Sequence, residues 1–431
     1  MEKFVFSFIF LDASKDLEIT AEKNLLPTVV TDFSAALAEN IDFEKHHINL
    51  SVYRKNDSQL RTNIESLVNK YKAKLPQIQQ LPKFFKDQDE DEFFFIGYNN
   101  ELTQDEILKV HASLEYLNAG KDYQQTMNEI EHLFGSVRKT YNIYAFYGAS
   151  KKRFYGEKDK SKRVCRFCHQ SQDTGAKFTM EAHTISESMG NKRIFSNEEC
   201  DICNDRLGSS VEQEFGEMHR IERCYLGIKG KEGVPVVKGD NFTMEHPVGG
   251  SIDIKIFNVN ETNVPEPNEI ELKYKSKYNL QNIYRCLVKY ALGVMPQEYV
   301  SHFYDVGDWV RNQKTLKRLP TLKKLTVAHP EIQPYLVLYI RKDDNNKELP
   351  FAIGEFHVLQ YIYVFIIPLS DMDDRDFCEP ADYNRFWSHF THYNSLNNWA
   401  NINISVDEAV EHIITMKFGG KMTNNEGNVG D

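Results

Sequence analysis

Two Cys-x-x-Cys pairs constrain the fold of this chain more than any other feature of its sequence. The first pair is Cys165 and Cys168, and the second is Cys200 and Cys203. Two such pairs are typical of a structural zinc site, in which four thiolates hold Zn²⁺ in a tetrahedron that is closed to water. A site of this kind fixes a short segment that could not otherwise bury a core. We therefore predict structural Zn²⁺ and a zinc-stapled segment between these cysteines.

The predicted zinc loop carries a histidine and two asparagines at a specific spacing. Thirteen residues separate His183 from Asn197, and six more separate Asn197 from Asn204, which directly follows the second cysteine pair. This spacing resembles the H-N-N form of the HNH endonucleases, and it favours a site residue at His183 over a satisfied core histidine. The zinc-bracketed arrangement is also similar to that of endonuclease VII-like resolvases and of bacterial defence and restriction HNH proteins.

The resemblance covers roughly residues 160–216, where Gly190-Asn191 and Gly208 also stand at matching places. It implies a ββα-metal core of the HNH/treble-clef-like type. His183 would end the first strand of a hairpin and act as the general base. Asn197 would brace the backbone around this histidine, and Asn204 would hold a divalent ion in the first turn of the helix.

The chemistry of phosphodiester hydrolysis is consistent with these implied roles. The reaction needs a base that activates water and a cation that offsets charge on the phosphate oxygens. Neutral imidazole, with a reference pKa of about 6.5, is a suitable base near neutral pH. A hard ion such as Mg²⁺ prefers oxygen ligands and keeps most of its waters, so few protein ligands suffice. We expect Mg²⁺ or Mn²⁺ as the catalytic cofactor.

The sequence departs from the family pattern directly before the histidine. Family members usually carry Asp or Glu there as a second metal ligand, whereas this chain has Ala182. Side chains two residues apart in a strand project to the same face, so Glu181 could reach the metal beside His183. Glu187 is a second candidate. The ion could also rely on Asn204, water and the substrate phosphate.

A basic segment leads into the first cysteine pair. Phe154 and Tyr155 are interleaved with its cations, and a flexible arm of this kind would neutralise phosphates without reading sequence. The alternative is a solvated linker between domains. The net charge of −11 argues mildly against a nucleic-acid binder, but charge can be local. The predicted nucleic-acid-binding residues are Lys151, Lys152, Arg153, Lys162, Arg163 and Arg166.

Length and composition indicate several globular domains. The chain has 431 residues, of which 41% are hydrophobic and 12% aromatic, as is ordinary for a protein with packed cores. It lacks a run of about 18 apolar residues, so we expect no membrane span. Seven cysteines, four of them in the zinc-type pattern, fit a reducing cytoplasm.

The predicted fold class is α+β, with the zinc-stapled nuclease core between two mixed α+β domains. The domains expected are an N-terminal α+β domain at 1–147, the basic arm with the HNH unit at 148–216, a C-terminal α+β domain at 217–417 and a disordered tail at 418–431. Hydrophobic periodicity predicts helices at 57–73, 103–117, 122–140 and 281–292, and strands at 2–11, 47–54, 92–97, 234–244, 250–258, 268–275, 335–341, 350–358 and 360–368.

These observations lead to one functional prediction and two alternatives. The chain is expected to be a metal-dependent HNH endonuclease that cuts DNA, and the resemblance suggests an effector of phage defence or restriction. Its expected protein partner would then be a second copy of the chain, in a homodimer, or a partner defence protein. One alternative is a non-catalytic zinc module in a nucleic-acid-binding or scaffold protein. The other is an HNH variant that cleaves RNA.

Overall fold

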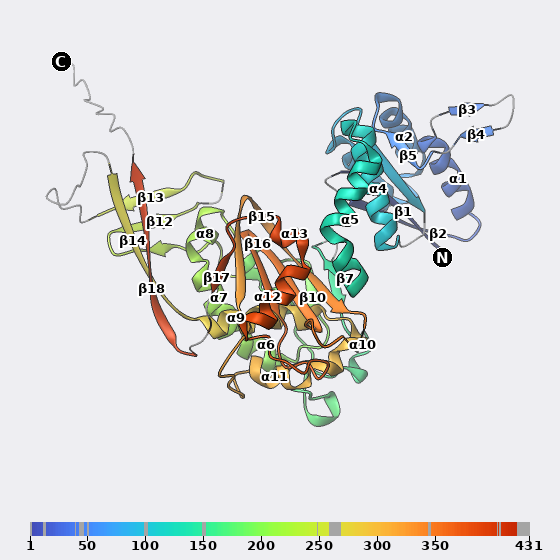
Figure 1. Ribbon diagram of the computed structural model, residues 1–431. Coiled ribbons are helices and arrows are strands. Elements are labelled where there is room, and N and C mark those ends of the chain that lie inside the picture. The colour runs from blue at the N-terminus through green and yellow to red at the C-terminus, as the bar shows by residue number, and fades with distance from the viewer. Residues whose placement is uncertain are drawn as a thin grey trace, which may run out of the picture. The chain divides into compact units, whose positions relative to one another are not determined.

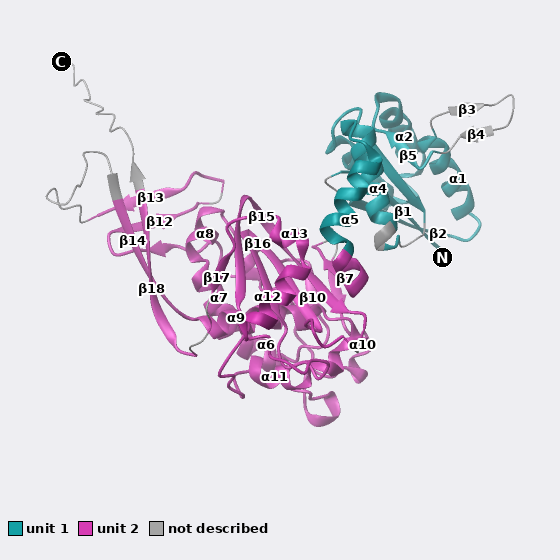
Figure 2. Ribbon diagram, in the orientation of Figure 1, with its two compact units in different colours: residues 1–135 teal, residues 136–431 magenta. Residues whose placement is uncertain are grey.

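The computed structural model has a mixed α+β fold. It describes residues 2–11, 14–38, 40–42, 47–49, 51–98, 102–148, 152–247, 249–257, 269–343, 346–402, 404 and 407–419 (Figure 1). The chain separates into two compact units, Met1–Gly135 and Ser136–Asp431 (Figure 2). None of the helices in the described ranges combines the length and the apolar character that a membrane crossing requires.

Unit 1 is built on an antiparallel sheet whose strand order is β2-β1-β6-β5. Its core is rich in phenylalanine, and Phe6 stacks on Phe33 with ring centroids 4.2 Å apart. The elements of this unit are β1 (Glu2–Ile9), β2 (Ser14–Ala21), α1 (Leu26–Leu37), β3 (Asn40–Asp42), β4 (His47–Asn49), β5 (Tyr53–Lys55), α2 (Ser58–Tyr71), η1 (Pro76–Gln80), α3 (Leu81–Lys86), β6 (Phe93–Tyr98), α4 (Gln104–Ala119) and most of α5 (Tyr123–Thr140).

Unit 2 contains the cysteine pairs and all of the remaining elements. Up to its central helix these are β7 (Tyr141–Phe146), β8 (Arg153–Tyr155), η2 (Lys160–Lys162), η3 (Gln172–Thr174), β9 (Ala182–His183), η4 (Glu187–Met189), β10 (Ile194–Ser196), α6 (Asp201–Gly208), α7 (Val211–Met218), α8 (Arg220–Tyr225), β11 (Val237–Lys238), β12 (Phe242–Glu245), β13 (Asp253–Ile256), β14 (Glu269–Asn279) and α9 (Leu280–Val294). After it come α10 (Gln297–Val300), η6 (Ser301–Phe303), α11 (Tyr304–Val310), β15 (Leu322–Arg341), β16 (Ala352–Ile366), α12 (Pro380–His389), α13 (Thr391–Asn394), β17 (Ala400–Ile402) and β18 (Ala409–Gly419).

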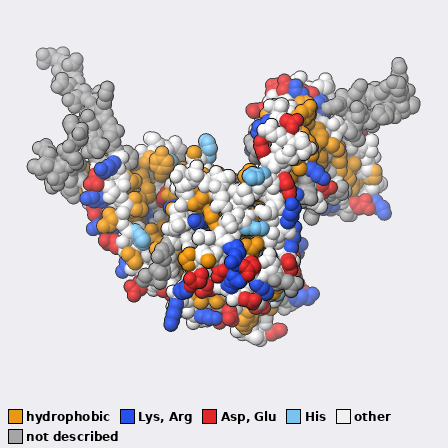
Figure 3. Space-filling view, viewed as in Figure 1, with side chains coloured by type: hydrophobic (Ala, Val, Ile, Leu, Met, Phe, Trp, Pro, Cys, Tyr) orange, Lys and Arg blue, Asp and Glu red, His pale blue; other side chains and the backbone are white. Residues whose placement is uncertain are grey.

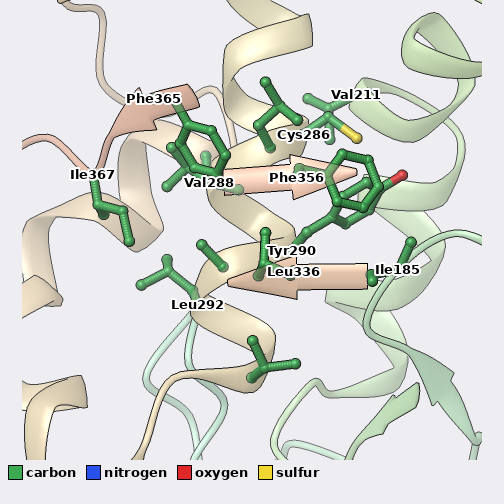
Figure 4. Packing of buried hydrophobic residues seen from close by; sticks show 14 of the residues in the cluster. Ile185, Val211, Cys286, Val288, Tyr290, Leu292, Leu336, Phe356, Phe365 and Ile367 are labelled. Carbon is green, nitrogen blue, oxygen red and sulfur yellow. The ribbon is translucent and has the colours of Figure 1, made fainter. Parts of the chain in front are cut away.

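Helix α9 forms the centre of unit 2. It is buried along its length, from Gln281 to Val294, because the segment with the cysteine pairs and the long β15–β16 hairpin both pack against it. Figure 4 shows this packing, with Ile185 on one side of the helix and Leu336 and Phe356 on the strands. The contact with the cysteine-bearing segment is close, since a Cβ at Gly293 would lie 2.5 Å from Cγ2 of Thr184. The predicted nuclease core therefore shares one hydrophobic core with elements from the C-terminal half.

The observed division differs from the domain boundaries expected from the sequence. It falls inside α5 instead of near residue 147, because β7 pairs with β15 and so belongs to unit 2. Of the expected tail, residues 418–419 end strand β18, and residues 420–431 lie outside the described part of the chain. The predicted strands at 350–358 and 360–368 are one strand, β16. The functional separation of the domains stays a prediction.

Candidate functional site

The four cysteines form one cluster. Their sulfur atoms all lie within 4.8 Å of one another, and the Sγ atoms of Cys168 and Cys200 are 3.6 Å apart. Four thiolates at about 2.3 Å from a tetrahedral Zn²⁺ would be separated by about 3.8 Å, so this donor set fits such an ion. The backbone N–H of Cys200 also points to Sγ of Cys165, at 3.5 Å. The residues can hold a structural metal such as zinc.

A small sheet with strand order β8-β10-β9 carries His183. β9 and β10 are antiparallel and β8 is parallel to β10, so that Phe154, Phe195 and His183 are register partners in one row across the sheet. The rings confirm that these side chains share a face. The centroids of Phe154 and Phe195 are 5.1 Å apart, and those of Phe195 and His183 are 4.4 Å apart. Helix α6 follows β10 and contributes Asn204.

The imidazole of His183 is mostly buried, with 28% of its side chain exposed. Its Nε2 lies 4.0 Å from Oε2 of Glu187, while its Nδ1 is buried and has no hydrogen-bond partner among the described residues. Burial lowers the pKa of His183, Glu187 opposes this effect, and Lys289 and Lys152 add to it. The side chain is therefore held in the neutral form that a general base requires.

Lys289, which no sequence motif pointed to, braces the strand that carries the histidine. Its Nζ donates to the backbone carbonyl of His183 at 2.8 Å and to that of Thr184 at 3.3 Å. The same ammonium lies 3.1 Å from Glu199 and 2.8 Å from Glu212. Although burial alone would lower the pKa of Lys289, the two carboxylates raise it, so the lysine stays charged. Nothing in the sequence near Lys289 signals this contact, because it lies on α9, far along the chain.

The resemblance implies that Asn197 braces the backbone around His183, but in the structure Asn191 makes these contacts and Asn197 makes others. Asn191 joins the ends of the β9–β10 turn, because its Nδ2 donates to the carbonyls of Ile185 at 2.6 Å and Ile194 at 2.9 Å. Asn197 accepts from Arg163 at 2.9 Å and donates to the carbonyl of Gly156 at 3.4 Å. The bracing next to the histidine is thus provided by Asn191, while Asn197 fixes the segment that precedes the first cysteine pair.

Asn204 lies in the first turn of α6, as expected, and faces the segment that leads into β9. Its Nδ2 lies 3.7 Å from Sδ of Met180. Asp201 secures the same junction, because its carboxylate accepts from the backbone N–H groups of Thr179 at 2.9 Å and Met180 at 3.0 Å. Two contacts therefore tie the start of α6 to the chain just before His183.

The two carboxylates proposed as metal ligands lie in different surroundings. Glu181 forms an ion pair with Lys152, whose Nζ also lies 4.8 Å from the centre of the Phe195 ring. Glu181 is thus on the face of the sheet that carries His183, but its charge is already compensated. Glu187 lies closer to the imidazole, and 38% of its side chain is exposed. Ala182 is fully buried, so its side chain points away from that face.

The basic segment is part of the folded site, and two of its predicted DNA-binding residues are not available for that role. Arg163 is bound to the carbonyls of Glu157 and Lys158 and to Asn197. Arg166 is 4% exposed, pairs with Glu198 at 2.8 Å and donates to carbonyls at the end of α9. The prediction that these two arginines bind nucleic acid was wrong, because their positive charge is used to hold the core together.

The other predicted cations lie on the surface. Lys152, Arg153 and Lys162 are exposed, and Lys151 lies outside the described residues. Lys192 and Arg193, in the turn before β10, add two exposed positive charges that the sequence analysis did not select. On the face seen in Figure 3, basic and acidic side chains are interspersed. Attraction of a phosphate backbone would therefore depend on a few local cations.

Comparison with known proteins agrees with this geometry. Residues 160–220 match the family model described as HNH endonuclease. The chain thus contains a segment of the HNH endonuclease family, which supports nuclease activity at the family level and implies a nucleic acid substrate. No curated protein and no solved structure matches the chain.

Proposed function

We propose that this protein is a metal-dependent endonuclease that hydrolyses DNA phosphodiester bonds, with His183 as the general base. The observation that carries the proposal is the imidazole itself. It is kept neutral by burial, has an unpartnered buried Nδ1 and stands beside Glu187 within the segment that matches the HNH family.

The residues around His183 fit a loosely held hard cation. Glu187 offers an oxygen atom beside the imidazole, and Glu181 offers a second if it leaves Lys152, while the resemblance implies Asn204 on α6 as a further ligand. Among the described residues, the one group of three or more His, Cys, Asp or Glu side chains close enough to hold a metal ion without other ligands is the cysteine cluster. A bound Mg²⁺ or Mn²⁺ would supply positive charge for the phosphate oxygens and the leaving group. Few protein ligands would suffice for it.

The chain's own residues would then perform the following tasks. Neutral His183 takes a proton from the attacking water. Lys289 and Asn191 hold the strand and the turn, so that the imidazole keeps its position during the reaction. Lys152, whose Nζ lies over the Phe195 ring, and the exposed Arg153 of β8 bind the phosphates of the strand to be cut.

The experiment that tests this function compares DNA and RNA of one sequence with Mg²⁺, with Mn²⁺ and with EDTA. The proposal expects cleavage of DNA with either metal and none with EDTA. Cleavage of RNA but not DNA would favour the RNA-cleaving alternative. A zinc-loaded, folded protein that binds nucleic acid and cuts neither would favour the non-catalytic zinc module and contradict the proposal.

A further inference from the structure

The row of rings at the candidate site ends in an exposed aromatic side chain. Phe154 is 40% exposed, although its partner Phe195 is almost completely buried. The register of β8 with β10 fixes the backbone of Phe154. Its ring is fixed by stacking on Phe195, with the ring centroids 5.1 Å apart and an angle of 23° between the ring planes. An apolar ring is thus presented to solvent by a rigid strand and not by a mobile loop.

The position of this ring relative to His183 is set by the sheet. Two steps between neighbouring strands, at about 4.8 Å each, place Phe154 about 10 Å from His183. A nucleic acid strand advances by about 3.4 Å per stacked nucleotide, so this distance corresponds to about three nucleotides, or fewer in an extended strand. Lys152 lies over Phe195, between the two ends of the row, where a phosphate of the same strand would pass.

We propose that Phe154 is a stacking platform for an unpaired base close to the scissile phosphate, and that the substrate class is nucleic acid with single-stranded character at that position. The inference rests on the proposed function and adds the kind of substrate. A base within a duplex is already stacked on both faces and cannot lie on a protein ring unless it leaves the helix. Stacking on an aromatic side chain accepts any base, which suits a site with few groups for reading sequence.

The charges around the row support a strand of nucleic acid as the occupant. Lys152 and Phe154 both share a face with Phe195, the former through its contact with the ring and the latter through the register. Arg193, in the turn directly before β10, is also exposed and adds a second positive charge next to this sheet. An aromatic ring flanked by cations is the combination used to bind single strands.

A binding experiment tests the stacking directly and does not require cleavage. Oligonucleotides with 2-aminopurine at successive positions near an unpaired segment are titrated with the full-length protein in EDTA. Wild type should quench the probe at one or two adjacent positions. Phe154→Ala should remove that quenching and weaken single-strand binding by about tenfold or more, while Phe154→Trp should restore both. Phe257→Ala is the matched control, because Phe257 is 41% exposed on unit 2 outside this sheet.

A cleavage experiment then compares a perfect duplex with the same duplex carrying an unpaired segment, in Mg²⁺ or Mn²⁺. Wild type should prefer the unpaired substrate, and Phe154→Ala should lose the preference while it still cuts. Equal binding and equal preference in wild type and Phe154→Ala would overturn the inference. If wild type cuts neither substrate, the proposed function fails, and the fluorescence result alone decides whether Phe154 stacks on a base.

Discussion

His183 lies in surroundings that set its protonation state as well as its position. Burial removes water from the ring and disfavours the imidazolium, and the nearby positive charges of Lys289 and Lys152 act in the same direction. Glu187 opposes them, but the pKa still lies below its ordinary value of about 6.5. A base with a lowered pKa stays competent at lower pH than an exposed histidine would.

The pH dependence of cleavage follows from the lowered pKa of His183. Activity should be present at neutral pH and be lost only as the pH falls through the lowered pKa, so that the acid limb of kcat/KM lies below about 6.5. Lys152→Met removes a charge that disfavours the imidazolium, and it should therefore move this limb to higher pH. A pH–rate profile of both proteins checks the shift, and a limb that moves to lower pH in the variant would contradict the assignment.

The two carboxylates near the histidine should differ in their effect on metal dependence. Glu187 lies 4.0 Å from the imidazole, whereas Glu181 is already paired with Lys152. Glu187→Gln should therefore raise the Mg²⁺ or Mn²⁺ concentration needed for half-maximal cleavage more than Glu181→Gln does. Metal titrations of the two variants measure this directly. The reverse order would show that Glu181 exchanges its lysine for the ion.

At the scale of elements, α9 positions β9 through Lys289, whose buried ammonium donates to the backbone carbonyl of His183. Lys289→Met would leave the carboxylates of Glu199 and Glu212 buried without their partner, which typically costs about 3–5 kcal/mol. Urea unfolding should show this loss of stability, with little change in the exposed control Lys238→Met. Adding Glu199→Gln and Glu212→Gln to the lysine variant should recover much of the stability. If Lys289→Met were as stable as wild type, the stability of the fold would not depend on the contacts of Lys289 with Glu199 and Glu212.

In unit 1 the sequence predicted β1, β6 and three helices but missed β2 and α1, and it predicted the elements around the site only in part. Helices α2 and α4 are confirmed at 58–71 and 104–119, because their apolar periodicity is joined to capping residues at Asp57 and Thr103. The cysteine cluster was predictable from spacing alone. The three-residue strand β8 has no alternation to reveal it, and its pairing with β10 depends on tertiary contacts.

The misjudged arginines and the missed lysine have a common physical reason. Arg166 is neutralised by Glu198 and by carbonyls at Leu292 and Met295, and Lys289 reaches the carbonyl of His183. More than one hundred residues of sequence separate α9 from these partners. A charge pattern read along the chain cannot distinguish a cation that is free for phosphate from one that is used in such a contact.

At the scale of the whole molecule, unit 2 is the smallest part that should hold the site. The apolar side chains of the matched segment, such as Phe167, Ile185 and Met189, belong to the same core as α9, β15 and β16. A fragment of residues 136–431 should therefore fold, bind one zinc per chain and keep the nuclease activity. Residues 160–220 alone should expose this apolar surface and lack fixed side-chain packing, even with zinc present. Dispersed side-chain resonances from the short fragment would contradict this account.

The central claim is that His183 performs the chemistry at a site whose fold does not depend on it. The most direct test measures cleavage, zinc content and thermal stability of His183→Ala beside the control His132→Ala, an exposed histidine of α5. Wild type and the control should cut with Mg²⁺ or Mn²⁺ and not with EDTA. His183→Ala should lose about 10²–10⁴-fold in rate while it keeps its zinc and its melting temperature. Cleavage by His183→Ala at the wild-type rate would contradict the account.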